Sequence, residues 1–243
     1  MRPPARLVAL VLAGATLAIG LTTGIDGWPG GRTPSILLGF PDCEAPGRGI
    51  VAQPTAAWTS LIFVAVGIWV AGDRRLISLP SRLLLAAALA GVGIGSFFGH
   101  AALTEWARQL DSLGIKLLLA TFIFASLGEL QSWKEPALIA GWATLVTVTF
   151  AVELALPGSA EPLLATLALA AITLSGLAAP PETRRWLVIG LILLAAGGAA
   201  WWLGRKGGPL CAPWAWFQLH GLWHILAAAG IASVYQIYRS ETT

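Results

Sequence analysis

The chain has 243 residues, of which 56% are hydrophobic and only 11% are charged. Soluble domains carry about 25% charged residues, so this composition excludes an ordinary soluble enzyme and a disordered protein. The net charge of +3 comes from 15 Lys and Arg against 12 Asp and Glu, without a basic stripe, which excludes a nucleic-acid-binding protein. The sequence therefore predicts an all-α, polytopic membrane helix bundle.

A transmembrane helix needs about 20 predominantly apolar residues. We expect eight spans, at residues 7–23, 55–71, 83–103, 112–128, 136–156, 162–179, 185–204 and 214–236. Pro and Gly in the gaps between the runs indicate turns. The pattern predicts an N-terminal hydrophobic segment at 1–24, an outer loop at 25–54 and a seven-span domain at 55–238.

The first apolar run has two interpretations. Arg2 and Arg6 before it are typical of a signal peptide, but no small-residue cleavage pattern follows, which favours an uncleaved span. Both interpretations place residue 24 outside the cytoplasm and the C-terminus inside.

The distribution of basic residues supports this orientation, because cytoplasmic loops carry an excess of Lys and Arg. Nine basic residues then lie on inner segments: Arg2, Arg6, Arg74, Arg75, Arg82, Lys134, Arg184, Arg185 and Arg239. Five lie on outer segments: Arg32, Arg48, Arg108, Arg205 and Lys206. Cys43 and Cys211 both fall in outer loops, on the oxidising side, so a disulfide between them is expected, the alternative being two separate thiols.

The chain has three histidines, and the predicted spans bring them to a similar depth. His220 and His224 lie near the outer end of the last span, where their i,i+4 spacing puts both imidazoles on one helix face. His100 lies near the outer end of span 83–103. Three imidazoles suit a zinc site that leaves its fourth position for water, whereas two histidines one turn apart cannot ligate opposite faces of a haem. The alternative is ordinary polar packing at the membrane interface.

Two further polar residues are predicted at the same depth. Ser96 lies one turn before His100 on the same helix face, and Asp111 opens the fourth span at its outer end. Buried ionisable groups inside a membrane are costly and usually functional. The Asp111 carboxylate is placed to reach a metal-bound water or to orient an imidazole.

Three separated segments together resemble the alkaline ceramidases, which belong to a seven-span membrane hydrolase superfamily that includes the progestin and adipoQ receptors. The segments are GSFFGH (95–100), QLD (109–111) and QLHGLWH (218–224). The family pattern has a serine four residues before a histidine, an aspartate eleven residues after it, and a late H-x-x-x-H with tryptophan before the second histidine. All these spacings hold here. PDCE (41–44) resembles the family's acidic segment before its first core span.

The resemblance implies a role for each of these residues. His100, His220 and His224 would bind zinc (Zn²⁺), Asp111 would take the proton from the zinc-bound water, and Ser96 would help to hold that water or the oxyanion. The implied reaction is hydrolysis of the amide bond of ceramide to a long-chain base and a fatty acid. The family's disulfide joins its first outer loop to a later one, in agreement with Cys43 and Cys211.

Alkaline ceramidases also hold calcium (Ca²⁺) in the acidic segment, where this chain departs from the pattern. Asp42 and Glu44 remain as possible ligands, but Gln53 stands where a second glutamate is expected and Pro46 where an asparagine is expected. Calcium takes six to eight oxygen ligands and gains from carboxylate charge. We therefore expect the calcium site to be weak or absent.

Two ionisable residues within the spans leave alternatives open. Lys116 is expected to pair with Asp111 or a lipid carboxylate, or else to snorkel to the outer surface. Glu153 is expected at the membrane interface rather than in an inward polar contact.

The leading functional hypothesis is a zinc-dependent hydrolase of ceramide-like lipid amides, with its active site toward the non-cytoplasmic side. The alternative is a receptor or sensor of the adipoQ-receptor type, in which zinc is mainly structural. Few residues follow the last span to carry a signal, which counts against a receptor. A transporter is less compatible, because neither an inverted repeat nor intramembrane carboxylates toward the inner side are evident.

Overall fold

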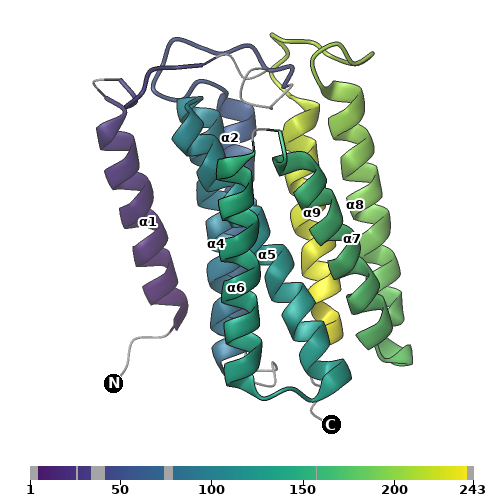
Figure 1. The fold of residues 1–243 in the computed structure, drawn as a ribbon. Helices are drawn as coiled ribbons and strands as arrows, with labels where there is room; N and C mark the ends of the chain where they lie inside the picture. Colours follow the sequence, from purple (N-terminus) through teal and green to yellow (C-terminus); the bar gives the residue numbers. More distant parts are fainter. Residues whose placement is uncertain (1–4, 26, 34–41, 74–78, 157, 240–243) are drawn as a thin grey trace.

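The computed structural model describes residues 5–25, 27–33, 42–73, 79–156 and 158–239, without the side chains of 5–9 and 79–81. The described residues form helices and no strand longer than an isolated bridge, which confirms the all-α prediction. The α-helices are α1 (Ala5–Thr23), α2 (Pro54–Ser60), α3 (Ile62–Gly72), α4 (Leu79–Ala102), α5 (Glu105–Gln131), α6 (Glu135–Ala155), α7 (Ala160–Ala178), α8 (Arg184–Gly204) and α9 (Leu219–Tyr235). They stand side by side as one bundle (Figure 1), and short 3-10 turns follow as η2 (Pro181–Thr183) and η3 (Gln236–Tyr238).

Six helical segments are long and apolar enough to cross a membrane, judged on length and composition. They are Pro54–Gly72, Arg82–Ala102, Glu105–Gln131, Glu135–Ala155, Ala160–Ala178 and Pro181–Gly204. The first of these joins α2 and α3 across Leu61, which keeps right-handed helical dihedrals. α9 has 17 residues, and its two histidines lower its apolar character. It nevertheless runs through the bundle, packed against α8, α2 and α3.

The closest helix pair, α4 and α5, approaches through glycines. A Cβ atom at Gly95 would lie 2.5 Å from the carbonyl oxygen of Leu110, and one at Gly114 would lie 2.6 Å from that of Gly91. Larger residues at these positions would force the helices apart. The GVGIG segment (91–95) is thus a packing surface, as its composition predicts, and it brings the end of α4 against the second turn of α5.

The N-terminal helix α1 lies at the edge of the bundle (Figure 1) and packs on α3 and α4. Gly20 allows this contact, because a Cβ there would overlap the ring of Phe98. The opposite face of α1 exposes Leu10, Val11 and Ile19. Such a face suits lipid better than water.

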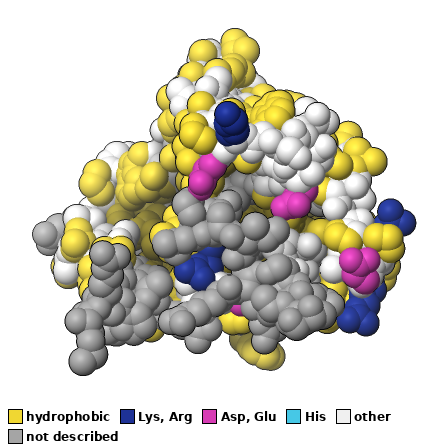
Figure 2. Space-filling model, turned by 90° about the horizontal axis from the view of Figure 1, so that it is seen from below, with side chains coloured by type: hydrophobic (Ala, Val, Ile, Leu, Met, Phe, Trp, Pro, Cys, Tyr) yellow, Lys and Arg dark blue, Asp and Glu magenta, His cyan; other side chains and the backbone are white. Residues whose placement is uncertain are grey.

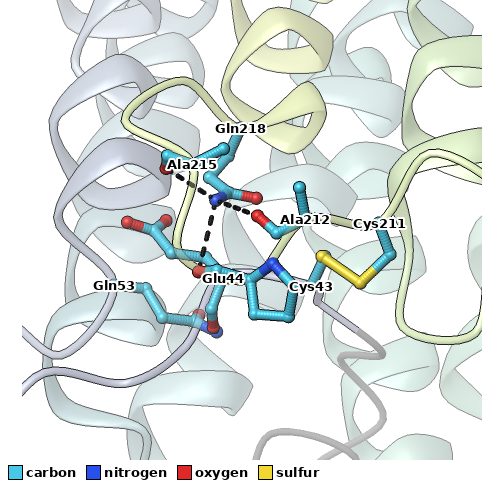
Figure 3. The surroundings of a disulfide bond; sticks show 8 residues. Cys43, Glu44, Gln53, Cys211, Ala212, Ala215 and Gln218 are labelled. Atoms are coloured by element: carbon cyan, nitrogen blue, oxygen red, sulfur yellow. Dashed lines mark hydrogen bonds between the residues drawn. A yellow bond between two sulfur atoms is a disulfide. The ribbon is translucent and has the colours of Figure 1, made fainter.

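At one end of the bundle, which we call the loop end, segments 42–53 and 205–218 are joined. A disulfide links Cys43 to Cys211, with Cα atoms 5.4 Å apart, and the amide N–H of Ala45 donates to the carbonyl of Pro213 at 3.0 Å. The side chain of Gln218 donates to the carbonyls of Ala212, Pro213 and Ala215, which hold the second loop in shape (Figure 3). The two loops therefore form one cross-linked cap over the helix ends.

The opposite end, where α1 begins and α9 ends, has a different polar lining. The Tyr238 hydroxyl lies 2.7 Å from Ser126 Oγ on α5 and 2.8 Å from Ser175 Oγ on α7, and all three side chains are buried. Arg239 pairs with Asp73 at 3.0 Å. Figure 2 views this end, with scattered charged side chains among hydrophobic ones and no histidine visible among the described residues. The histidines lie instead at the loop end.

Candidate metal centre

The three histidines meet between α4 and α9 at the loop end. One ring nitrogen from each of His100, His220 and His224 lies within 4.8 Å of the others. His100 and His224 are only 2% and 4% exposed, and His220 is partly buried. Within the part of the chain that the structure describes, no other group of His, Cys, Asp or Glu has metal-binding spacing. The i,i+4 spacing on α9 places His220 and His224 on one face, and the end of α4 contributes His100.

Each histidine has a polar neighbour at its Nδ1 atom, and all three neighbours come from segment 42–59. His100 Nδ1 lies 2.8 Å from Gln53 Oε1. His220 Nδ1 lies 2.7 Å from Asp42 Oδ1, and His224 Nδ1 lies 3.1 Å from Thr59 Oγ1. A partner of this kind orients a metal-binding imidazole and fixes its tautomer.

Two of these neighbours, Gln53 and Thr59, assign the tautomers of His100 and His224. The carboxylate of Asp42 and the amide oxygen of Gln53 are acceptors. The Thr59 hydroxyl gives its one proton to the carbonyl of Thr55 at 2.6 Å, so its oxygen can only accept from His224. In His100 and His224, Nδ1 therefore carries the hydrogen, and Nε2 is the unprotonated nitrogen of the neutral ring.

The spacing of the ring nitrogens suits a metal ion. Nε2 of His220 and Nε2 of His224 are 3.1 Å apart. Three imidazoles with one ring nitrogen each within 4.8 Å of the others match the donor set of a three-histidine metal site.

Ser96 and Asp111 lie beside this cluster, as their spacing predicts. Ser96 Oγ is 3.5 Å from His224 Nε2, and Ser96 also hydrogen-bonds to the carboxylate of Asp111. Both residues are buried. Asp111 also packs beside Gly99, where a Cβ would lie in ordinary van der Waals contact, 3.6 Å from Asp111 Oδ2. The structure thus brings five predicted site residues together: His100, His220, His224, Ser96 and Asp111.

The residues predicted as possible calcium ligands have other partners. Glu44 accepts the backbone N–H of Thr55 at one carboxylate oxygen (2.8 Å) and that of Ala56 at the other (2.9 Å), which caps the first turn of α2. Its main-chain carbonyl accepts from Gln53 Nε2 at 3.0 Å. Both carboxylate oxygens of Glu44 thus already accept backbone amides, whereas calcium takes six to eight oxygen ligands. The described part of the acidic segment therefore gives the calcium site no support.

Asp42 lies under the histidines. Its Oδ2 is 3.5 Å from His100 Nδ1, although neither of its oxygens makes a well-aligned hydrogen bond. Burial alone would raise the pKa of Asp42, but its attraction to His220, its contact with that ring and the nearby His100 together hold the pKa below the usual value. Asp42 is therefore a charged neighbour of two imidazoles.

The expectations for Lys116 and Glu153 were wrong. Lys116 is fully buried and pairs with the carboxylate of Glu153 on α6, neither snorkelling nor pairing with Asp111. The same carboxylate accepts from Ser112 Oγ at 2.7 Å and from Arg108 at 2.7 Å. Glu153 thus makes inward contacts and is not interfacial. Each of these charged side chains therefore lies beside one of opposite sign. The partners lie on two different helices, so their spacing in the sequence does not predict the contact.

The fold and the histidine cluster define a polytopic helical membrane protein with a candidate metal centre among its helix ends. The ceramidase family model matches residues 49–241, which is most of the chain, so the chain belongs to the ceramidase family. This match confirms the family resemblance found in the sequence. The matched region covers the three histidines, Ser96 and Asp111, and it leaves out α1 and Asp42. The comparison with curated proteins finds no match.

Sequence reasoning gave no metal-related role to Gln53 and did not single out Thr59. Gln53 entered only as a departure from the calcium pattern, and Thr59 is one of many hydroxyls in a span. Each touches a histidine far away in sequence, so no local spacing signals the contact.

Proposed function

We propose that the chain is a zinc-dependent intramembrane hydrolase that cleaves the amide bond of ceramide-like lipids to a long-chain base and a fatty acid. One observation carries the proposal: one ring nitrogen from each of three histidines converges beside a serine and an aspartate that are hydrogen-bonded to each other. Family membership supports the class of reaction. The adipoQ-receptor alternative gains no comparable support.

His100, His220 and His224 would hold the metal through Nε2. Bound zinc supplies a Lewis acid that polarises a carbonyl and lowers the pKa of a coordinated water to about 7. The remaining chemistry belongs to the side chains. Asp111 would accept a proton as water attacks the amide carbon, and would then deliver it to the departing nitrogen as the C–N bond breaks. The water thereby supplies the hydroxyl of the carboxylic acid product and the proton of the amine product.

Ser96 would have two roles in this reaction. Its hydrogen bond to Asp111 would orient the carboxylate, and its position 3.5 Å from His224 Nε2 would keep the hydroxyl close to the developing oxyanion. Burial of Ser96 and Asp111 excludes bulk water and strengthens these interactions.

The membrane setting supports a lipid substrate and an orientation for the site. A bundle of apolar helices presents its site to long-chain molecules that partition into the bilayer. The disulfide at the loop end needs an oxidising compartment, which supports placing the metal centre toward the non-cytoplasmic side.

Metal removal tests the proposal. Purified protein in detergent micelles is expected to release fatty acid from a ceramide, to lose this activity after treatment with a strong chelator, and to recover it when zinc is added back. Added calcium is not expected to restore the activity of the chelated protein, because both carboxylate oxygens of Glu44 already accept backbone amides. Amide hydrolysis that persists unchanged in demonstrably zinc-free protein would contradict the mechanism.

A further inference from the structure

The side chain of Gln53 is fully buried at the junction of the outer loop and the metal centre. Its backbone N–H donates to the carbonyl of His100 at 3.1 Å, while its Oε1 lies 2.8 Å from Nδ1 of the same histidine. Its Nε2 donates to the main-chain carbonyl of Glu44 at 3.0 Å. Gln53 therefore contacts His100 through both its backbone and its side chain, and links it to the segment beside Cys43. Figure 3 shows Gln53, Glu44 and Cys43 together.

These contacts fix which way the amide faces. The NH2 group must face the Glu44 carbonyl, because a flipped amide would set two acceptor oxygens against each other there. The amide oxygen is then the atom that faces His100, and an acceptor at Nδ1 requires the hydrogen on that nitrogen. The network assigns this orientation from its donors and acceptors. The result is a His100 ring that presents the lone pair of Nε2 to the metal.

A neutral amide suits this position because a charge is already present. Asp42 is buried and its Oδ2 lies 3.5 Å from the same Nδ1 atom. A second carboxylate at position 53 would add a buried negative charge near Asp42 and Glu44, at a cost in desolvation and repulsion. Gln53 accepts from the imidazole and donates to a carbonyl without adding charge.

We propose that Gln53 is a positioning residue of the metal centre: its amide holds the His100 ring in the orientation and tautomer that bind zinc. The inference rests on the zinc function proposed above. Through Gln53, the disulfide-linked outer loop would influence how tightly His100 on α4 binds zinc. Gln53 itself would not contact the substrate.

Zinc affinity of three variants, measured by competition with a chromogenic chelator, tests this role. Gln53→Met keeps the volume but removes the acceptor, and is expected to weaken zinc binding by about 10- to 100-fold. Gln53→Glu keeps an acceptor oxygen for His100 but loses the donor to Glu44. It is expected to lower the melting temperature while zinc affinity stays close to that of the wild type.

Gln218→Met is the matched control. Gln218 is a buried glutamine in the other outer loop, and its amide donates to three carbonyls without a described contact to a histidine (Figure 3). This variant is expected to lose stability and to keep the wild-type zinc affinity. A purely structural role for Gln53 predicts the same behaviour for Gln53→Met.

Each outcome decides the inference. Wild-type zinc affinity in folded Gln53→Met would overturn the positioning role and leave the hydrolase proposal standing. Should Gln53→Met not fold, a folded Gln53→Glu with affinity reduced tenfold or more would overturn it, and retained affinity would support it. Zinc-free wild-type protein would instead overturn the proposed function, and the positioning role with it.

Discussion

Asp111→Asn is expected to leave zinc bound and to lower the rate of amide hydrolysis by about 10²- to 10⁴-fold, the usual contribution of a general base. Asparagine keeps the size of the side chain and its hydrogen bond to Ser96. It cannot accept a proton from water or return it to the leaving nitrogen. Because Asp111 lies beside the histidines without being one of the three clustered ligands, zinc content should not change.

The measurement is turnover on ceramide together with zinc content of the same sample. Glu129→Gln is the matched control, since Glu129 lies on α5 as well and its side chain is exposed. It removes one negative charge from the same helix and should retain full activity. Normal turnover in Asp111→Asn would refute the assignment of Asp111 as the proton acceptor, and loss of zinc would assign it to the metal shell.

Glu153→Gln is expected to destabilise the protein strongly, by about 3–5 kcal/mol, because it leaves a buried ammonium group without its counter-charge. Lys116 is fully buried, and its described partners are Glu153 and the Ser112 hydroxyl at 2.6 Å. In addition, α6 packs mainly on α5, so this cluster is a principal polar link between the two helices. The free energy of unfolding in detergent measures the effect.

Two further variants separate charge from packing. Glu135→Gln removes an exposed carboxylate from the same helix, and its effect should stay below about 1 kcal/mol. Lys116→Met combined with Glu153→Gln removes both buried charges and should recover much of the loss. If Glu153→Gln unfolds at the wild-type denaturant concentration, the ion pair does not stabilise the α5–α6 contact.

Periodicity and composition predict the helices well, because each span must satisfy its own backbone hydrogen bonds inside the membrane. The predicted run 55–71 appears as α2 and α3, and 185–204 nearly coincides with α8. The chain starts α5 at Glu105, earlier than the predicted 112, because the amphipathic turn that carries Arg108 is helical without being wholly apolar. The charged residues in that turn lower its mean hydropathy, so a search for apolar runs misses the start of the helix.

Some features of the site depend on residues close in sequence, and others depend on contacts between distant segments. The i,i+4 pair on α9 and the Ser96–His100 spacing are local, so the sequence indicates them directly. The Nδ1 partners Gln53 and Thr59 touch histidines on other helices, and Lys116 meets Glu153 across two helices. Such contacts depend on helix rotation and packing, which one sequence does not determine. Asp42 entered as a possible ligand of a weak calcium site through the family resemblance, whereas its described spatial neighbours are the imidazoles of His100 and His220.

The most direct test of the account is the zinc content of detergent-purified protein, measured by elemental analysis for the wild type beside His224→Ala. Three converging imidazole nitrogens predict about one zinc per chain in the wild type, as in other three-histidine sites. Loss of one of them predicts a largely zinc-free, folded variant. A folded wild type without zinc, or a His224→Ala protein that keeps its zinc, would contradict the metal centre and reduce the three histidines to polar packing between α4 and α9.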